Sequence, residues 1–216
     1  PVVESHPVLV LKHVPTDFVS SETRHFLQSA DDESGFPLHG AIRAVFREFD
    51  AHEKAVSDAK AKGLTPPAAH VLTDLDVTEA LHSPEAYRGA YVRLFGKLAD
   101  TYPIGFDHPE VPDGALTGGV LVTINESQGV QWVMRDRMEP YDRAERKRIE
   151  IEGVFVQNVH YESNDSRHVG EKMVTAPFLV VSKLRFVDRV AENKWMGKLW
   201  LMVVIGLTVV VARGAI

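Results

Sequence analysis

Ten histidines and no cysteine set the side-chain chemistry open to this chain of 216 residues. Without cysteine there is no disulfide, no thiolate zinc ligand and no cysteine nucleophile. The histidines lack the His-Glu-x-x-His spacing of a helical metal site. His160 and His168 flank one predicted loop, and an enzyme or metal-handling protein could use such histidines. A metal site needs three or four converging ligands, however, so we predict no metal site and no cofactor.

Motifs for nucleophilic catalysis or phosphate binding are weak. Gly-x-Ser-x-Gly is absent, and Ser127 lies in a predicted hairpin loop, where serine is common for reasons of turn geometry. Thr117-Gly118-Gly119 is too short for a phosphate-binding loop, which continues to a Gly-Lys pair. We therefore assign no catalytic residue and favour a protein that is not an enzyme.

One concentration of basic residues could bind an anion or a lipid headgroup. The residues that could form this site are two aromatic and three basic ones, Trp132, Tyr141, Arg135, Arg137 and Arg146. Acidic residues interleave with the basic ones between positions 135 and 148, so a solvated charged turn explains the run without a ligand. Trp132 fits a core residue at least as well as an exposed stacking surface.

The charge balance argues against phosphate polymers as partners. The net charge is −6. Residues 1–87 carry 14 acids and 7 bases, whereas residues 88–190 carry 15 acids and 14 bases. An acidic first part and a neutral middle do not attract a phosphate backbone, so we expect no nucleic acid as partner.

The clearest predicted element is an amphipathic helix over residues 37–62. Ile42, Val45, Phe46 and Phe49 recur at helical spacing on one face, and Gly63 follows as a C-cap. We expect Phe46 and Phe49 to dock this helix onto the rest of the domain. Ser20 and Asp76 predict the starts of two short helices.

From residue 90 onward the apolar period changes to that of strands. Five strands are predicted, at 90–100, 116–124, 130–136, 149–161 and 178–187. Gly153, in the middle of the fourth, predicts a bulge or a coil. The predicted core residues of these strands are Val92, Leu94, Val120, Val122, Ile151 and Phe155.

Three stretches carry a resemblance to a known group of proteins. They are residues 84–96, Ile151-Glu152-Gly153-Val154-Phe155, and residues 176–181. The chain resembles bacterial membrane-anchored proteins with an OB-fold-like domain, a small five-stranded barrel. The resemblance implies an α+β fold with such a barrel over 76–190, placed outside the cytoplasm, and it carries no activity.

The C-terminal stretch is predicted to anchor the chain in a membrane. Residues 199–212 contain no charge, and a predicted transmembrane helix over 195–213 approaches the length that spans a bilayer. Trp195, Lys198, Trp200 and Arg213 fit the interfacial positions of such a helix. Basic residues before the helix instead favour a cytoplasmic, tail-anchored body, and a buried C-terminal element is a third alternative.

These observations predict three parts: an N-terminal extension over 1–75, a barrel domain over 76–190, and one membrane helix. The favoured function is a membrane-anchored, non-catalytic binding or scaffold module that contacts the lipid bilayer. One alternative is an accessory subunit that binds other membrane proteins in a larger complex. Another is an enzyme or metal-handling protein that uses the loop histidines.

Overall fold

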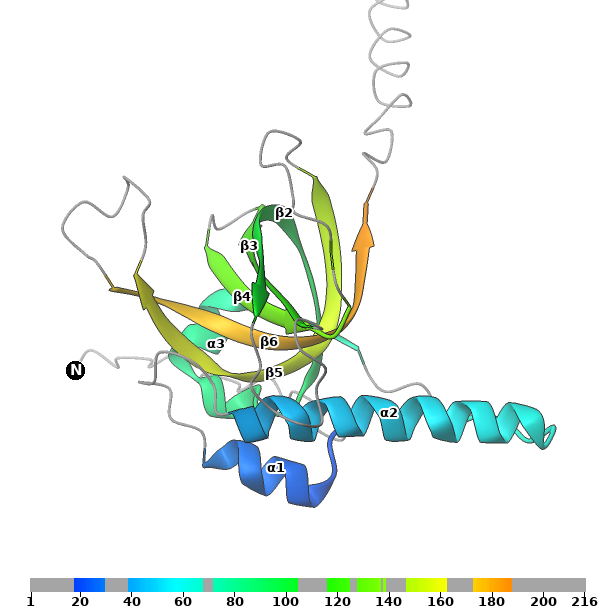
Figure 1. Ribbon diagram of the computed structural model, residues 1–216. Helices are drawn as coiled ribbons and strands as arrows, with labels where there is room; N and C mark the ends of the chain where they lie inside the picture. The colour runs from blue at the N-terminus through cyan, green and yellow to red at the C-terminus, as the bar shows by residue number, and fades with distance from the viewer. Residues whose placement is uncertain are drawn as a thin grey trace, which may run out of the picture. The chain divides into compact units, whose positions relative to one another are not determined.

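The computed structural model describes residues 18–29, 39–67, 72–104, 116–124, 128–136, 138, 147–162 and 173–187. The chain divides into two compact units, Pro1–Phe186 and Val187–Ile216. All helices and strands described below belong to the first unit (Figure 1).

The helices begin where the sequence supplies caps. α1 spans Ser21–Gln28, and the hydroxyl of Ser20 accepts a hydrogen bond from the backbone N–H of Thr23. α2 spans His39–Ala61, within two residues of the predicted bounds at its start and one at its end. α3 spans Val77–His82 with Asp76 as its N-cap, and a 3-10 turn follows at Pro84–Ala86. Gly63 has φ +65°, which suits the residue after a helix.

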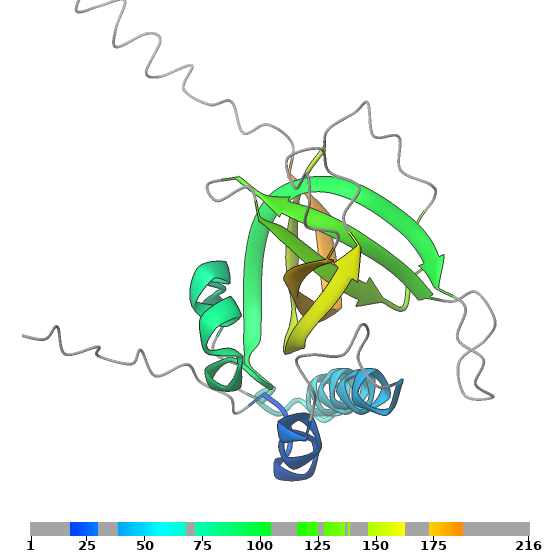
Figure 2. The same ribbon diagram turned by 90° about the vertical axis from the view of Figure 1, so that its left-hand side faces the viewer.

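The strands form one mixed sheet. They are β1 (Thr73–Asp74), β2 (Tyr91–Ile104), β3 (Leu116–Thr123), β4 (Gly129–Met134), β5 (Arg148–Glu162) and β6 (Met173–Phe186). Their order is β1-β2-β3-β4-β6-β5, and β2 also pairs with β5. The pairings β1–β2 and β4–β6 are parallel, and the others are antiparallel. Pairing therefore runs in a closed cycle through β2, β3, β4, β6 and β5. Figure 2 shows the same sheet turned by 90°.

The predicted fold class needs correction. A five-stranded barrel between a helix and a transmembrane helix was expected, whereas the structure is a mixed sheet of six strands with few helices. The additional strand, β1, has only two residues, Thr73 and Asp74, and is too short to produce a period of alternating side chains. It pairs with Val92 and Arg93 of β2.

The sheet has an apolar cluster on each side. The inner cluster lies within the cycle of strands and includes Val92, Trp132 and Phe155, with α3 contributing Val77 and Ala80. The outer cluster lies between α2 and the strands β4, β5 and β6; its members include Phe46, Phe49, Val133, Val154, Phe178 and Val180. Phe46 and Phe49 are 3% and 8% exposed, which confirms that they dock α2 onto the sheet.

Two of the six predicted core residues are wrong. Val92, Leu94, Ile151 and Phe155 are buried, but Val120 and Val122 of β3 are only half-buried. Leu121, between them, is fully buried in the inner cluster. The three residues are all apolar, so the local pattern does not determine which side faces inward.

The membrane prediction also needs correction. Among the described residues, no helix is both long and apolar enough to cross a membrane. α2 has sufficient length, with 23 residues, but charged side chains recur along it; α1 and α3 are too short. The predicted anchor residues Trp195, Lys198, Trp200 and Arg213 lie outside the described part of the chain. Single-pass membrane localisation therefore has no support and is not carried further.

Candidate functional site

The outer side of strands β2, β5 and β6 has two halves with different environments. α2 packs over the first half, where Val154, Phe178 and Val180 belong to the outer apolar cluster. We call this the covered half. The second half carries charged side chains and one exposed ring, and we call it the open face. Its outward residues are Arg93, Phe95 and Lys97 of β2, Arg148, Glu150 and Glu152 of β5, and Lys183 and Arg185 of β6.

A cleft of about 550 Å³ lies at the boundary between the two halves. Its α2 wall includes His52, Val56 and Lys60, and its sheet wall is made by Tyr91, Glu152, Ser182 and Lys183. The volume falls in the range of small-molecule pockets in proteins, roughly 300–1,000 Å³. The boundary therefore offers a concave site of suitable size for a small ligand.

Aromatic rings form the inner end of this cleft. The ring of Phe18 stacks on that of Tyr91, with 4.6 Å between centroids and 15° between planes. Phe49 meets Tyr91 edge-on at 6.4 Å and lies 5.4 Å from Phe18. Phe18 and Phe49 are each 8% exposed, so the rings are held by packing before any ligand arrives.

A β-bulge directs the polar groups of the cleft. Glu152 of β5 pairs with Lys183 of β6, whereas the next residue, Gly153, pairs with Val181. Ser182 is therefore the extra residue between two registers, and both Ser182 and Lys183 reach the outer side. A Cβ on Gly153 would lie 2.8 Å from the Cα of Val181, so the strands approach closely only because this residue is glycine.

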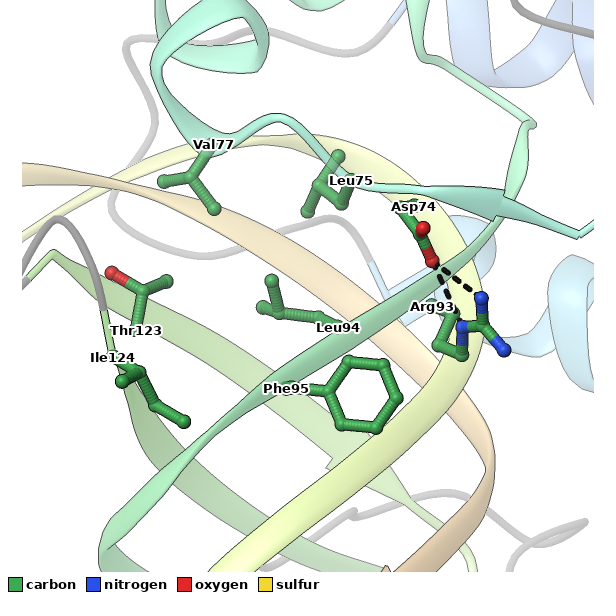
Figure 3. Close-up of a pocket in the computed structure, with 8 residues that line it drawn as sticks. All are labelled: Asp74, Leu75, Val77, Arg93, Leu94, Phe95, Thr123 and Ile124. Atoms are coloured by element: carbon green, nitrogen blue, oxygen red, sulfur yellow. Dashed lines mark hydrogen bonds and ion pairs between the residues drawn. The ribbon is translucent and has the colours of Figure 1, made fainter. Parts of the chain in front are cut away.

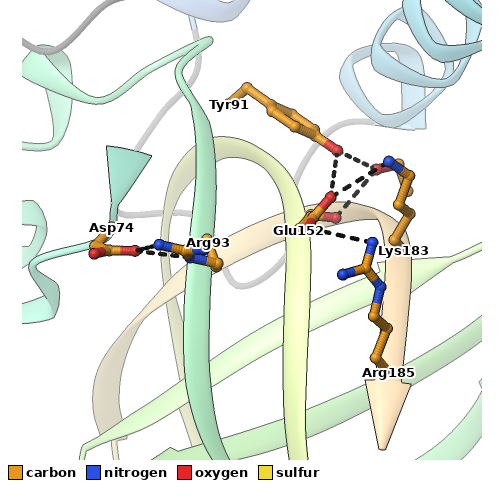
Figure 4. Close-up of polar contacts among 7 residues, drawn as sticks. Asp74, Tyr91, Arg93, Glu152, Lys183 and Arg185 are labelled. Carbon is orange, nitrogen blue, oxygen red and sulfur yellow. Dashed lines mark hydrogen bonds and ion pairs between the residues drawn. The ribbon is translucent and has the colours of Figure 1, made fainter. Parts of the chain in front are cut away.

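Tyr91, Ser182 and Glu152 form a hydrogen-bonded triangle beside this bulge. Figure 4 shows the polar contacts around Tyr91 and Glu152. The hydroxyls of Tyr91 and Ser182 lie 2.9 Å apart. The Tyr91 hydroxyl also donates to the Glu152 carboxylate at 3.3 Å, and the Ser182 hydroxyl donates to the Glu152 carbonyl oxygen at 3.2 Å. Each hydroxyl has one hydrogen, so two hydrogens serve three contacts. The triangle therefore has room for one further donor.

The Glu152 carboxylate also faces two cations. Its oxygens lie 3.5 Å from the Lys183 nitrogen and 3.7 Å from an Arg185 nitrogen, both longer than a direct charge-assisted hydrogen bond. The Glu152 side chain is 10% exposed and those of Lys183 and Arg185 are 57% and 58% exposed. Burial raises the pKa of Tyr91, the hydrogen bond with Ser182 lowers it in part, and the negative charge of Glu152 raises it. The phenol thus stays protonated and acts by hydrogen bonding.

A second hollow, of about 320 Å³, lies where β1 ends beside β2 (Figure 3). Leu75, Val77 and Leu94 line it, and the side chains of Phe95 and Ile124 are exposed at its edge. The Asp74 carboxylate is 2.8 Å from the Arg93 guanidinium at one end. This hollow has fewer polar groups that converge than the cleft, and we do not assign it a ligand.

The structure separates the residues of the predicted anion site. Trp132 is fully buried in the inner cluster, against Gly119. Arg135 lies at the end of β4, where its guanidinium is 2.5 Å from the Asp50 carboxylate and 4.7 Å from the centre of the Phe46 ring. Arg135 therefore bridges β4 to α2. Tyr141, Arg137 and Arg146 lie outside the described residues.

The predicted loop histidines do not assemble a metal site in the described part of the chain. His160 is half-buried near the end of β5, and His168 lies outside the described residues. No group of three or more histidine, aspartate or glutamate side chains within that part is placed to hold a metal ion.

The sequence analysis missed the cleft residues Tyr91, Ser182 and Glu152. They lie 61 and 30 residues apart along the chain, so no local motif joins them. One signal was present: Glu152 interrupts the apolar stretch around Ile151 and Val154 and precedes Gly153. A charged residue beside a glycine inside a strand indicates a bulge, and burial of that charge requires a partner.

Comparisons with known proteins give little beyond the fold. No family model and no curated protein matches the chain. A solved structure of U. maydis replication protein A bound to ssDNA is similar to 63% of this chain and 91% of that chain, with 12% identity and a TM-score of 0.30. Strand order and pairing support the coarser statement that the chain carries an OB-like domain. Membrane anchoring and a bacterial source find no support in these comparisons.

The predicted partners need correction as well. The lipid bilayer was expected because of the membrane helix, which the described residues do not contain. Nucleic acid was excluded on the charge balance, but a structure similar to this chain is a protein bound to ssDNA. The exclusion is withdrawn, because the net charge of a long stretch does not determine the charge of one face. At this TM-score the similarity assigns no ligand to the chain.

Proposed function

We propose that this protein is a ligand-binding module whose ligand places an aromatic or apolar group in the cleft between α2 and the sheet. The observation that carries the proposal is the stacked pair of Phe18 and Tyr91 at the inner end of a concave site. Preformed pockets with aromatic walls and a few converging polar groups are the usual sites for small ligands.

The polar groups of the cleft specify a hydrogen-bond donor on that ligand. The triangle of Tyr91, Ser182 and Glu152 holds two hydroxyl hydrogens for three contacts. A ligand O–H or N–H supplies the third hydrogen, and a carboxylate such as that of Glu152 is a strong acceptor. The preferred ligand is therefore a flat apolar group that carries one donor.

The test uses 2-naphthol as the probe and 2-methoxynaphthalene, which lacks the donor, as its control. The full chain is labelled with 3-fluorotyrosine, and the Tyr91 resonance is identified as the one missing from Tyr91→Phe. We expect 2-naphthol to shift this resonance and to bind about tenfold more tightly than the methyl ether. That ratio corresponds to one hydrogen bond of about 1.4 kcal/mol.

A pair of tryptophan variants locates the binding site. Val56→Trp fills the cleft from α2 and should abolish the shift, because Val56 lines the cleft. Leu64→Trp adds the same ring at a position that is 61% exposed and should leave binding unchanged. Equal binding by the two variants, or equal affinity for the two probes, would contradict the proposal.

A further inference from the structure

The open face is basic although the chain is acidic. It combines five cations with two carboxylates on β2, β5 and β6; the cations are Arg93, Lys97, Arg148, Lys183 and Arg185, and the carboxylates are Glu150 and Glu152. Five minus two gives a charge of +3, or +2 when Asp74 of β1 is included with Arg93, against −6 for the whole chain. Positive charge is therefore gathered on one face.

One pair of these cations adds repulsion to the folded state, although other cations of the face lie opposite carboxylates, as Lys183 lies opposite Glu152. Lys97 and Arg148 occupy directly opposite positions on β2 and β5. Like charges placed opposite each other on neighbouring strands destabilise a sheet. A ligand of negative charge would offset that repulsion, whereas the isolated domain gains nothing from it.

An exposed aromatic ring lies among the cations. Phe95 is 44% exposed, and the Arg93 guanidinium lies 5.4 Å from the centre of its ring. Arginine and aromatic residues are enriched at the centres of protein–protein interfaces. The face thus offers an apolar contact surrounded by positive charge.

We propose that the open face docks an acidic segment of a partner protein. The segment places carboxylates on the cations of β2 and β6 and an apolar side chain on Phe95. Glu152 and Lys183 also border the cleft, but this proposal does not depend on the ligand of the cleft.

The carboxylates of β5, the strand between β2 and β6, favour a protein segment over a phosphate polymer as the ligand. Glu150 and Glu152 of β5 lie between the cations of β2 and those of β6. A phosphate chain carries a charge at every residue and would meet these carboxylates. A polypeptide can place neutral residues over β5. The two rows of cations are about 10 Å apart, and three residues of extended chain cover that distance.

This spacing defines the probe. The peptide Ac-(Glu-Thr-Phe)4-NH2 has a carboxylate at every third residue, and Ac-(Gln-Thr-Phe)4-NH2 is its uncharged control. Binding of each labelled peptide to the full chain is measured by fluorescence anisotropy. We expect the acidic peptide to bind, the uncharged peptide to bind at least tenfold more weakly, and the acidic peptide to lose affinity as salt is raised.

Charge reversal on the open face supplies the decisive variants. Lys97→Glu with Arg185→Glu should weaken binding of the acidic peptide about tenfold or more. Lys54→Glu with Lys62→Glu changes the net charge equally but lies on and after α2, and should change affinity less than twofold. If the first pair impairs folding, Lys97→Gln with Arg185→Gln should weaken binding in the same direction.

Three results would overturn the proposal. They are no binding of the acidic peptide, equal binding by the open-face and α2 variants, and tighter binding of a 15-residue oligo-dT than of the peptide. The last result would assign the face to a phosphate polymer. Lys97 does not line the cleft, so Lys97→Glu alone should leave binding of 2-naphthol unchanged while it weakens binding of the acidic peptide. Failure of this proposal is thereby distinguishable from failure of the cleft.

Discussion

Two groups of arginine, aspartate and phenylalanine lie in different regions of the same sheet. Arg135 contacts Asp50 and lies over Phe46 where α2 covers the strands. Arg93 contacts Asp74 and lies over Phe95 on the open face. The chemical groups are the same, but Phe46 is 3% exposed and Phe95 is 44% exposed. Contact geometry alone therefore does not tell whether such a group serves the fold or a partner.

The strands differ between the two regions in the same way. From Ile151 to Val159, every residue of β5 is buried, because the inner cluster, to which α3 contributes, covers one side and the outer cluster beneath α2 covers much of the other. On the open face, β2 alternates between buried and exposed residues from Tyr91 to Leu98. The sheet is buried on both sides where a helix covers it and amphipathic where none of the described elements does.

The largest expected effect separates the two phenylalanines. Phe46→Ala should lower the free energy of unfolding by about 3–5 kcal/mol, because it removes a fully packed ring from the outer cluster. Phe95→Ala should cost less than about 1 kcal/mol, since its ring already contacts solvent. Urea unfolding of the two variants measures the difference. Similar losses would mean that the open face is also part of the stabilising core.

The next effect concerns the bulge at the boundary of the two regions. Gly153→Val should lower stability by about 1–3 kcal/mol, although valine favours strands, because its Cβ would overlap the backbone of Val180 and Val181. Lys97→Val places the same residue at an exposed strand position and should change stability by less than about 0.5 kcal/mol. Thermal melts compare the two variants. An unchanged melting temperature for Gly153→Val would mean that the strands can separate there without loss.

A smaller effect should distinguish the two arginines. Arg135→Ala removes contacts that join β4 to α2 and should cost about 1 kcal/mol. Arg93→Ala removes an exposed pair with Asp74 and should cost a few tenths of a kcal/mol. Double-mutant cycles with Asp50→Ala and Asp74→Ala isolate the two ion pairs. A larger coupling energy for Arg93 with Asp74 than for Arg135 with Asp50 would contradict the expectation that the Arg135 group contributes more to stability.

The smallest expected effect lies in the helical layer and depends on pH. One oxygen of Glu48 accepts hydrogen bonds from the Ser20 hydroxyl at 2.5 Å, the Thr23 hydroxyl at 2.6 Å and the Ser20 N–H at 3.1 Å, which joins α1 to α2. Burial raises the pKa of Glu48, but these hydrogen bonds outweigh it, and the pKa lies below its ordinary value of 4.5. A lowered pKa stabilises the fold above the unfolded-state value, and this stability is lost as pH falls through the folded-state value.

Glu48→Gln tests this dependence. At pH 6 the variant should melt about 1–2 °C below the unmodified chain, a small difference because Glu48 is only half-buried. The difference should narrow as the pH falls from 6 toward 3, since Glu48 becomes protonated as the pH passes through its lowered pKa. A difference that stays constant from pH 6 to pH 3 would show that the charge of Glu48 is not the cause.

Periodicity predicted the elements that repeat over many residues. α2 and five of the six strands follow the expected ranges. Their apolar residues recur over at least two helical turns, or over at least two alternations along a strand. The side of the sheet that each strand residue faces was harder to predict. In β6, Phe178 and Val180 belong to the outer cluster, whereas Leu184, an even number of residues further along the strand, packs against the inner one. The bulge at Ser182 reverses the alternation of inward and outward side chains along β6, and no pattern in the sequence marks Ser182 as the extra residue.

The site was less predictable than the fold for a related reason. Its residues meet only because β2, β5 and β6 pair, and their partners depend on register rather than on neighbours in sequence. The sequence pattern instead favoured Trp132 and Arg135 as site residues. In the structure Trp132 belongs to the core, and Arg135 contacts α2. Opposite charges on separate strands, such as Glu152 and Lys183, give no local signal.

The pairing of β2 with β5 has a consequence for how the protein folds. Its partners lie 51 to 63 residues apart, from Lys97 with Arg148 to Tyr91 with Val154. Contacts across such separations form slowly, because the intervening chain must first lose its freedom. The basic face draws on three strands and exists only after this late step. A nascent or partly folded chain would not display it, so recognition of the open face would itself report that folding is complete.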